Sequence, residues 1–481
     1  MERTLSSSMV GVVLWGAMLS AFSGTARPQA AGRVPSAPLA PGQVIEKVLC
    51  AGSPGESYAL YLPSNYTPGR RWPILYAFDP GARGRIPVTL YKDAAEKYGY
   101  IVAGSNNSQN FTNEPPKRSI FALWQDTHER FSLDEHRTYT TGFSGGARTA
   151  TMVALRCPVC AVAGVIAHGA GYPNSDKPSQ KDTFLYFAAV GNEDFNWGEI
   201  VELRRKREES GLPYRMEVFE GEHQWASAEI VEEAIEWMQL KAMQTGSLRR
   251  NDTFIGQLFK ETEARAKEAE NRRDAISQLS AYRSLVSDFG GLKEVGEYAE
   301  KLAALKRSAL LKEAFKKEQA EIREQESLTQ TISGQLSHLG DIGVRDQSGL
   351  RESVREGMKQ LKEDAAHSKN AEKRLVRLRA FHDLWAQGIE AGQAELLAKH
   401  PARAEDYFQL MADMAPDAWW PLLLLADTRT AMGNRKQAIK DLREGIRRGL
   451  KHAEVIEKDE SLQPLRSEPE FQKMLSELTA K

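Results

Sequence analysis

The sequence has little of several features that mark specialised classes of protein. Only 3 of its 481 residues are cysteine, too few for a disulfide scaffold. Lys and Arg number 64 against 65 Asp and Glu, so no net field draws the chain towards nucleic acid or an anionic membrane. Low-complexity blocks are absent, and after residue 22 no apolar run is long enough to span a bilayer. These absences favour a globular protein without a membrane span in its mature form. A chain of 481 residues is too long for one ordinary core, so we expect two or three domains.

The first residues contain the one strongly apolar stretch. A single arginine precedes an apolar run from Met9 to Phe22, and small residues follow at Gly24–Ala26 and Gln29–Ala31. This order is typical of a secretory signal peptide, so we expect residues 1–31 to be removed and the protein to be exported, to the periplasm or the medium. An uncleaved anchor is the alternative. We expect residues 32–43, which include a Pro-rich stretch, to be a spacer.

The three cysteines give no metal site. Cys157 and Cys160 form a C-x-x-C pair, but a zinc site would need a second pair that the sequence lacks. A local disulfide and two packed thiols both remain open for this pair. We expect Cys50 to be a buried strand residue. No pattern in the chain calls for a metal or another cofactor, and we expect none.

Between residues 44 and 246, short apolar runs rich in β-branched and aromatic residues alternate with helical patterns. Such alternation predicts an α/β domain: a mostly parallel sheet with helices on both faces, opened by an antiparallel hairpin. Strands are expected at Tyr58–Leu62, Pro73–Phe78, Tyr100–Ala103, Thr138–Phe143, Ala161–Ala167, Phe184–Val190 and Tyr214–Phe219. Helices are expected at Leu90–Tyr98, Ile120–Phe131, Ala147–Leu155, Gly198–Ser210 and Ala226–Ala242.

After residue 246 the strand pattern ends and an all-helical pattern begins. Ala404 and Phe408 recur as Ala438 and Leu442, an offset of 34 residues, and a helix-approach position at Gly392 recurs as Ala426. In this spacing, residues 367–481 resemble tetratricopeptide repeats, and residues 247–366 resemble them weakly. The resemblance implies a surface that binds a protein or peptide partner. A helical bundle without repeats is the alternative.

The segment Gly142–Gly146 reads G-x-S-x-G between a predicted strand and a predicted helix. Small residues around the serine allow a sharp turn, which exposes the hydroxyl above the sheet edge at the positive end of the helix. This context predicts Ser144 as a nucleophile, and a serine nucleophile needs a base. His223 follows the last predicted strand, where the base of such a fold belongs, whereas His168 is expected to be a core residue.

The acid that orients the histidine should follow the strand between the nucleophile and the base. Asp194 is the first choice there and Glu193 the alternative. An oxyanion hole needs two N–H donors, for which we expect Gly145 and either Gly81 or Ala82, because Pro80 has no N–H.

Substrate contacts are expected from two loops of the first half. Arg83 is a candidate for a substrate carboxylate, although a solvated loop arginine is the alternative. Phe111, in the polar loop Ser105–Arg118, is a candidate for the substrate wall.

These motifs resemble the α/β-hydrolase superfamily between Trp72 and Trp237. They are most similar to compact esterases of the polyhydroxybutyrate-depolymerase, feruloyl-esterase and dienelactone-hydrolase kind. The similar segments are T-G-F-S-G-G-A-R at the nucleophile, G-N-E-D at the acid and G-E-H-Q-W at the histidine. The chain departs from them at Asp79-Pro80, where those esterases usually carry His-Gly. The resemblance implies a metal-independent serine hydrolase with Ser144, Asp194 and His223 as its triad.

Cleavage of carboxylic esters through an acyl-enzyme is the expected function, with an ester as the substrate. A peptidase with the same triad is one alternative, and a hydrolase-like binding protein whose helices carry the function is another. The connection from Gly169 to Thr183, between the serine motif and the acid, is too short to form a lid over the site. We expect the helical half to be a tethered binding module, but it could instead cover the active site.

Overall fold

The computed structural model describes residues 39–110, 116–173, 176–340, 347–451, 453–457 and 459–479. The expected signal peptide and most of the expected spacer lie outside these residues. From Leu39 onward the chain forms one compact unit. No helix in the described ranges is both long enough and apolar enough to cross a membrane.

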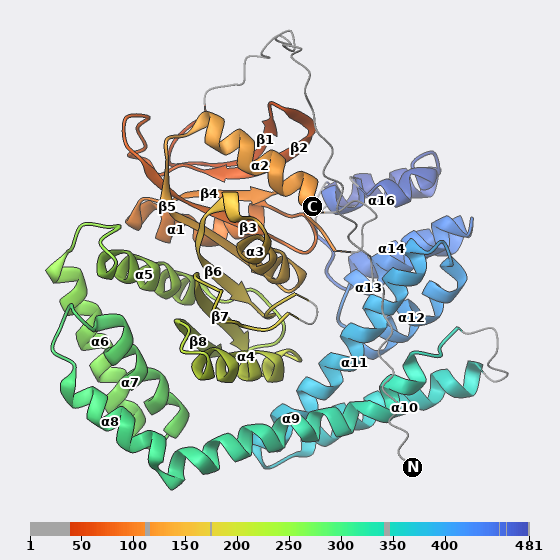
Figure 1. Cartoon of the computed structure of the whole chain (residues 1–481). Coiled ribbons are helices and arrows are strands. Elements are labelled where there is room, and N and C mark those ends of the chain that lie inside the picture. The colour runs from red at the N-terminus through yellow and green to blue at the C-terminus, as the bar shows by residue number, and fades with distance from the viewer. Residues whose placement is uncertain are drawn as a thin grey trace, which may run out of the picture. The chain divides into compact units, whose positions relative to one another are not determined.

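An eight-stranded sheet occupies the first half of the described chain, in the order β1-β2-β4-β3-β5-β6-β7-β8 (Figure 1). β1 and β2 form an antiparallel hairpin, β2 is antiparallel to β4, and all further pairs are parallel. This is the α/β-hydrolase arrangement, so the predicted fold class is confirmed. The strands are β1 Val44–Cys50, β2 Ser53–Tyr61, β3 Trp72–Phe78, β4 Ile101–Ser105, β5 Leu133–Phe143, β6 Val162–His168, β7 Leu185–Gly191 and β8 Tyr214–Phe219.

Helices cover both faces of the sheet because its strands bury alternate residues in opposite directions. On β3, Ile74 and Tyr76 face one apolar cluster and Leu75 faces the other. The first cluster is completed by α2, α3 and α4, the second by α1 and α5. These helices are α1 Arg85–Tyr98, α2 Lys117–Arg130, α3 Gly145–Arg156, α4 Trp197–Glu209 and α5 Ala228–Gln244.

The three cysteines lie in this first half. Cys50 ends β1 and is buried, as predicted. Cys157 and Cys160 are joined by a disulfide around the 3₁₀ turn Pro158–Cys160, which resolves the open choice in favour of the bond.

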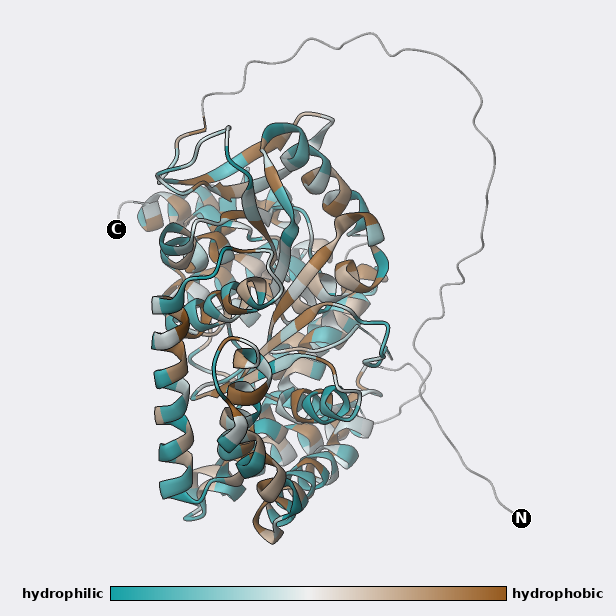
Figure 2. Cartoon of the chain, turned by 60° about the vertical axis from the view of Figure 1, so that its left-hand side comes forward, coloured by the Kyte–Doolittle hydropathy of each residue, from teal (hydrophilic) through white to brown (hydrophobic). Residues whose placement is uncertain are grey.

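After α5 every regular element in the described ranges is helical. Figure 2 shows most of these helices carrying both hydrophobic and hydrophilic residues, as amphipathic packing requires. They are α6 Asp252–Arg272, α7 Ala275–Phe289, α8 Gly296–Arg307, α9 Ala309–Leu336, α10 Gln347–His367, α11 Ala371–Leu397, α12 Pro401–Met414, α13 Trp420–Ala431, α14 Arg435–Arg447, α15 Ala453–Glu457, the 3₁₀ helix Glu460–Leu465 and α16 Pro469–Thr479.

The positions of the 34-residue offset are buried where the helices pack. Ala404 of α12 and Ala438 of α14 are fully buried, as are Phe408 and Leu442. A Cβ on Gly392 would stand 2.5 Å from the Phe408 ring, so α11 and α12 approach closely there, as the glycine indicated. Membership of the tetratricopeptide family stays a prediction.

The two halves of the unit share apolar and ionic contacts. Leu240 of α5 packs in the same cluster as Leu285 and Phe289 of α7. Arg204 of α4 pairs with Glu318 of α9 at 3.0 Å. The helical half is therefore packed onto the α/β half through several elements rather than tethered by a linker.

We predict that Leu285→Ala lowers the free energy of unfolding by about 2–5 kcal/mol, because it leaves a cavity in a fully buried cluster. Leu310→Ala is the matched control, since this leucine is 40% exposed, and should change stability by less than about 0.5 kcal/mol. Urea unfolding of the two variants measures both effects. Equal losses would contradict the core described for α7.

Candidate active site

Ser144 lies at the turn between β5 and α3, with φ 54° and ψ −123°. A non-glycine residue adopts such a backbone only where its surroundings enforce it. Here the neighbouring glycines allow the close packing that holds Ser144 in this conformation. A Cβ on Gly142 would stand 2.1 Å from the Gly146 oxygen, and a Cβ on Gly146 would stand 2.0 Å from the Phe78 oxygen. The G-x-S-x-G spacing thus allows the strand, the turn and the helix to pack against β3.

Asp194 and His223 meet at the carboxyl ends of β7 and β8. His223 Nδ1 lies 2.9 Å from Asp194 Oδ2, and the aspartate is fully buried. Its other oxygen accepts the Asn196 N–H at 2.8 Å, at the start of α4. Glu193, the alternative acid, instead pairs with Arg374 at 3.2 Å. The structure therefore brings Asp194, not Glu193, to the histidine.

Aromatic rings hold the imidazole of His223 beside the serine turn. Phe143 directly precedes Ser144, and the centre of its ring lies 4.6 Å from the centre of the His223 ring. The centre of the Phe195 ring lies 4.4 Å from the same imidazole. No hydrogen bond joins the Ser144 hydroxyl to His223 in the described part of the chain. The serine, the histidine and the acid nevertheless gather at one edge of the sheet, in the chain order that the sequence suggested.

The Gly81 N–H is not free to serve an oxyanion. It donates to Asp79 Oδ1 at 2.9 Å, and the Ala82 N–H donates to the Asp79 carbonyl at 3.0 Å. The expectation that Gly81 or Ala82 is the second oxyanion donor is therefore corrected. Both N–H groups donate to Asp79 within their own turn. Asp79 also accepts the Trp225 indole N–H at 3.2 Å, which ties this loop to the histidine loop.

The two expected substrate contacts fare differently. Arg83 forms two hydrogen bonds to Asp79, at 2.7 and 3.1 Å, so its charge is neutralised within its own loop. The expectation that Arg83 binds a substrate carboxylate is corrected accordingly. Phe111 lies outside the described residues.

Asn110 was not predicted, and it lies directly on the turn that carries Ser144. A Cβ on Gly145 would stand 2.0 Å from Asn110 Oδ1 and 2.3 Å from Nδ2. The Asn110 N–H is fixed by the Pro80 carbonyl at 2.9 Å. The available signal was the polar run Ser105–Asn110 after a predicted strand, because the carboxyl ends of parallel strands meet at one edge.

Charged groups of α3 and α4, and one from the helical half, lie near this edge. Arg148, in α3, is held by Glu199 through two bonds of 2.7 and 2.8 Å. Glu390 of α11 interacts electrostatically with Arg148 and His223. Burial raises the pKa of Glu390, and the neighbouring Arg148 and His223 oppose this rise only in part. The electrostatic environment of the histidine thus includes a helix from the second half.

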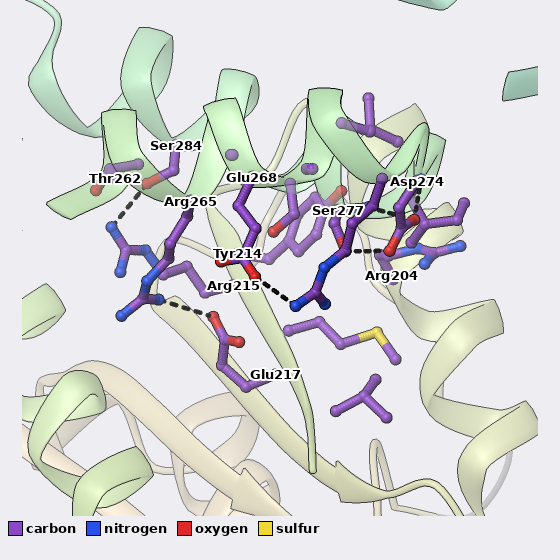
Figure 3. Close-up of a pocket in the computed structure, with 18 of the residues that line it drawn as sticks. Arg204, Tyr214, Arg215, Glu217, Thr262, Arg265, Glu268, Asp274, Ser277 and Ser284 are labelled. Carbon is purple, nitrogen blue, oxygen red and sulfur yellow. Dashed lines mark hydrogen bonds and ion pairs between the residues drawn. The ribbon is translucent and has the colours of Figure 1, made fainter. Parts of the chain in front are cut away.

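Two cavities have linings that do not include the serine, the histidine or the aspartate. One, of about 400 Å³, lies between β8 and the helices α6 and α7, and the other, of about 500 Å³, lies beside Arg148. Figure 3 shows arginines of the first cavity directed at acidic partners, such as Arg265 with Glu217. Neither lining includes Ser144, Asp194 or His223. The described residues contain no group of three or more His, Cys, Asp or Glu that could hold a metal.

No family model matches the chain, and no curated protein matches it. Among solved structures, it is similar to S-formylglutathione hydrolase from Staphylococcus aureus, at 15% identity over 38% of this chain and 90% of that chain, with a TM-score of 0.31. A feruloyl esterase module from Clostridium thermocellum aligns at 18% identity over 37% and 80%, TM-score 0.29. A thermophilic carboxylesterase from a metagenomic library aligns at 11% over 41% and 87%, TM-score 0.32. Because these similarities are low, a function for this protein has to be argued from its own side chains.

His168 is buried in the core, as predicted, and carries a pH-dependent part of the stability. Its Nε2 lies 2.9 Å from the Tyr91 hydroxyl, while its Nδ1 has no partner in the described residues. Burial lowers the pKa of His168 to about 3. Because the unfolded value is about 6.5, the neutral ring stabilises the fold fully above that pH, and this stability is lost as the pH falls towards 3.

We predict that His168→Gln makes the fold less sensitive to acid. Between pH 7 and pH 5 the original chain should lose on the order of 2 kcal/mol more unfolding free energy than the variant. Urea unfolding at the two pH values measures this difference. Identical losses would show that His168 does not titrate in this way.

Proposed function

We propose that this protein is an exported serine hydrolase that cleaves carboxylic esters through a Ser144–His223–Asp194 triad. One observation carries the proposal: a buried aspartate is bonded at 2.9 Å to a histidine whose ring centre lies 4.6 Å from that of Phe143, the residue before a backbone-strained serine. Buried carboxylates orient an imidazole and stabilise its protonated form. A strained serine at a helix N-terminus is a common nucleophile arrangement in this fold.

The reaction follows from these positions. Ser144 Oγ attacks the ester carbonyl, and His223 Nε2 accepts the proton of the hydroxyl. Asp194 keeps the proton of the imidazole on Nδ1 and stabilises the imidazolium that forms. The imidazolium then protonates the leaving alcohol, which leaves an acyl-enzyme. Water attacks this intermediate with the same assistance from His223 and releases the acid.

The negative charge of the tetrahedral intermediate needs two donors near Ser144. The Gly145 N–H, at the N-terminus of α3, is the first. We propose the Asn110 side-chain N–H as the second, because it lies against Gly145 while the Gly81 and Ala82 amides are engaged by Asp79. A side-chain donor fits this role because the backbone bond to Pro80 fixes the position of Asn110.

Export and partner binding belong to the same proposal. The disulfide between Cys157 and Cys160 supports an oxidising compartment, which agrees with the apolar, small-residue pattern of residues 1–31. The burial pattern around residues 367–481 supports helical repeats. We propose that a concave surface of these repeats recognises a peptide or protein, and we propose the domain limits 44–246, 247–366 and 367–481.

A peptidase with the same triad is the second candidate, and substrates that share one acyl group separate the two. An ester and an amide of the same chromogenic series differ only in the leaving group. We expect turnover of the ester without measurable turnover of the amide. A hydrolase-like binding protein would turn over neither.

We predict that Ser144→Ala removes nearly all ester turnover and labelling by a fluorophosphonate probe, because the attacking hydroxyl is gone. His223→Ala should lose both properties as well. Ser210→Ala, at the end of α4, is the control and should label as the original chain does. Labelling of Ser144→Ala at the original rate would refute the nucleophile.

We predict that Asn110→Ala lowers kcat by about 10²–10³ with KM little changed, which is typical for loss of one oxyanion donor. Asn110→Asp should lower it at least as far, because a carboxylate repels the oxyanion. Asn106→Ala is the control from the same loop, since its side chain bonds to the Glu46 carbonyl at 3.1 Å instead. Steady-state kinetics on a short-chain ester measure all three, and an unchanged kcat for Asn110→Ala would exclude this donor.

A further inference from the structure

The loop Asn192–Asn196 carries the proposed acid, and we call it the acid loop. Three of its carbonyl groups are bound by side chains that come more than a hundred residues later in the chain. The Asn192 carbonyl accepts Arg379 Nε at 2.7 Å, and the Glu193 carbonyl lies 2.9 Å from His382 Nδ1. The Phe195 carbonyl accepts Gln325 Nε2 at 3.0 Å. Helices α9 and α11 thus hold the backbone on both sides of Asp194.

Two amide groups of the acid loop bind the segment that leads to the histidine. The Asn192 N–H donates to the Phe219 carbonyl at 2.8 Å, and the Glu193 N–H donates to the Gly221 carbonyl at 2.9 Å. Both acceptors belong to the segment that leads to His223. The acid loop is therefore fixed between the histidine segment on its N–H side and the helical half on its carbonyl side.

Arg379 does more than bind one carbonyl. Its guanidinium is buried, lies 3.7 Å from the centre of the Trp197 ring, and pairs with Glu321 of α9 at 3.0 Å. Burial lowers the pKa of Arg379, and the charges of Glu321, Asp194 and Glu193 oppose this. The guanidinium therefore also places positive charge near the buried Asp194.

Gln325 connects α9 to the histidine through one aromatic ring. It is 8% exposed, and its amide fixes Phe195, whose ring lies 4.4 Å from His223. Close by, a Cβ on Gly198 would stand 3.2 Å from Ile322 of α9. The start of α4 and the end of the acid loop thus pack directly on α9.

We propose that α9 and α11 belong to the catalytic centre, with Gln325, Arg379 and His382 as positioning residues that hold Asp194 and Phe195 in register with His223. The inference rests on the proposed function and deepens it. A small displacement of a catalytic group lowers the rate of the chemical step by a large factor. The affinity for substrate depends on other contacts and is not changed by such a displacement. Loss of a positioning contact should therefore lower kcat rather than raise KM.

These contacts correspond to the picture in which the helical half completes the site, rather than to a separable binding module. The chain offers a matched pair of glutamines to test it. Gln325 and Gln278 are each 8% exposed, and each donates to a backbone carbonyl, at 3.0 and 3.1 Å. Only Gln325 bonds to the acid loop, because Gln278 bonds to Ala269 of α6.

The experiment compares Gln325→Leu with Gln278→Leu in the full chain. We expect Gln325→Leu to lower kcat for a short-chain ester about 10–100-fold, with KM changed less than about twofold. Gln278→Leu should keep the original kcat although both variants lose a similar amount of thermal stability. Equal kcat values for the two variants would overturn the proposal.

A double-mutant cycle tests whether Gln325 acts through the acid. Asp194→Asn alone should lower kcat strongly, and adding Gln325→Leu to it should cause little further loss. A full, multiplicative loss in the double variant would mean that Gln325 acts by another route, against the proposal.

A second pair of variants guards against poor folding of Gln325→Leu. His382→Phe removes the bond to the Glu193 carbonyl, and His367→Phe removes an equivalent bond to the Glu363 carbonyl within α10. Only His382→Phe should lower kcat, and equal kcat values would again overturn the proposal. If Ser144→Ala loses labelling while both pairs behave alike, the positioning role fails alone. If Ser144→Ala still labels, the proposed function fails first.

Discussion

The buried carboxylate of Asp194 sets the main constraint on this molecule. A charged group without solvent is costly unless hydrogen bonds and opposite charge surround it. Here the Asn196 amide and His223 are its direct partners, and the charge of Arg379 acts on it from α11. Three segments of the chain that are distant in sequence must therefore converge around this carboxylate. The interactions of this one carboxylate thus connect the ends of β7 and β8 with α11 of the helical half.

Much of the α/β half could be predicted because its signals are local. The strands and helices follow from alternating apolar runs, and the Ser144 turn follows from the glycines around it. Asp194 and His223 could be placed because strand ends of a parallel sheet share one edge. Each inference needed only the order of the elements along the chain and the period of the side chains.

What could not be predicted depends on partners that are distant in sequence or on side chains that compete for one amide. Gly81 was expected to be a donor because Pro80 has no N–H, but its N–H donates a hydrogen bond to the carboxylate of Asp79, two residues earlier. Asn110 reaches the nucleophile turn only because its own backbone bonds to Pro80. The bond from Gln325 to Phe195 crosses 130 residues, and no local pattern in the sequence identifies the carbonyl that this glutamine reaches.

The close contact between Asn110 and Gly145 has a consequence for how such a site can change over generations. A methyl group at position 145 would occupy the space of the Asn110 amide, 2.0 Å from its oxygen. A larger residue at 145 is thus tolerated only after position 110 has become smaller, and shortening position 110 removes a donor. The effect of a substitution at one position therefore depends on the residue at the other. In evolution or in a mutant library, a change to another oxyanion donor would require substitutions at both positions together.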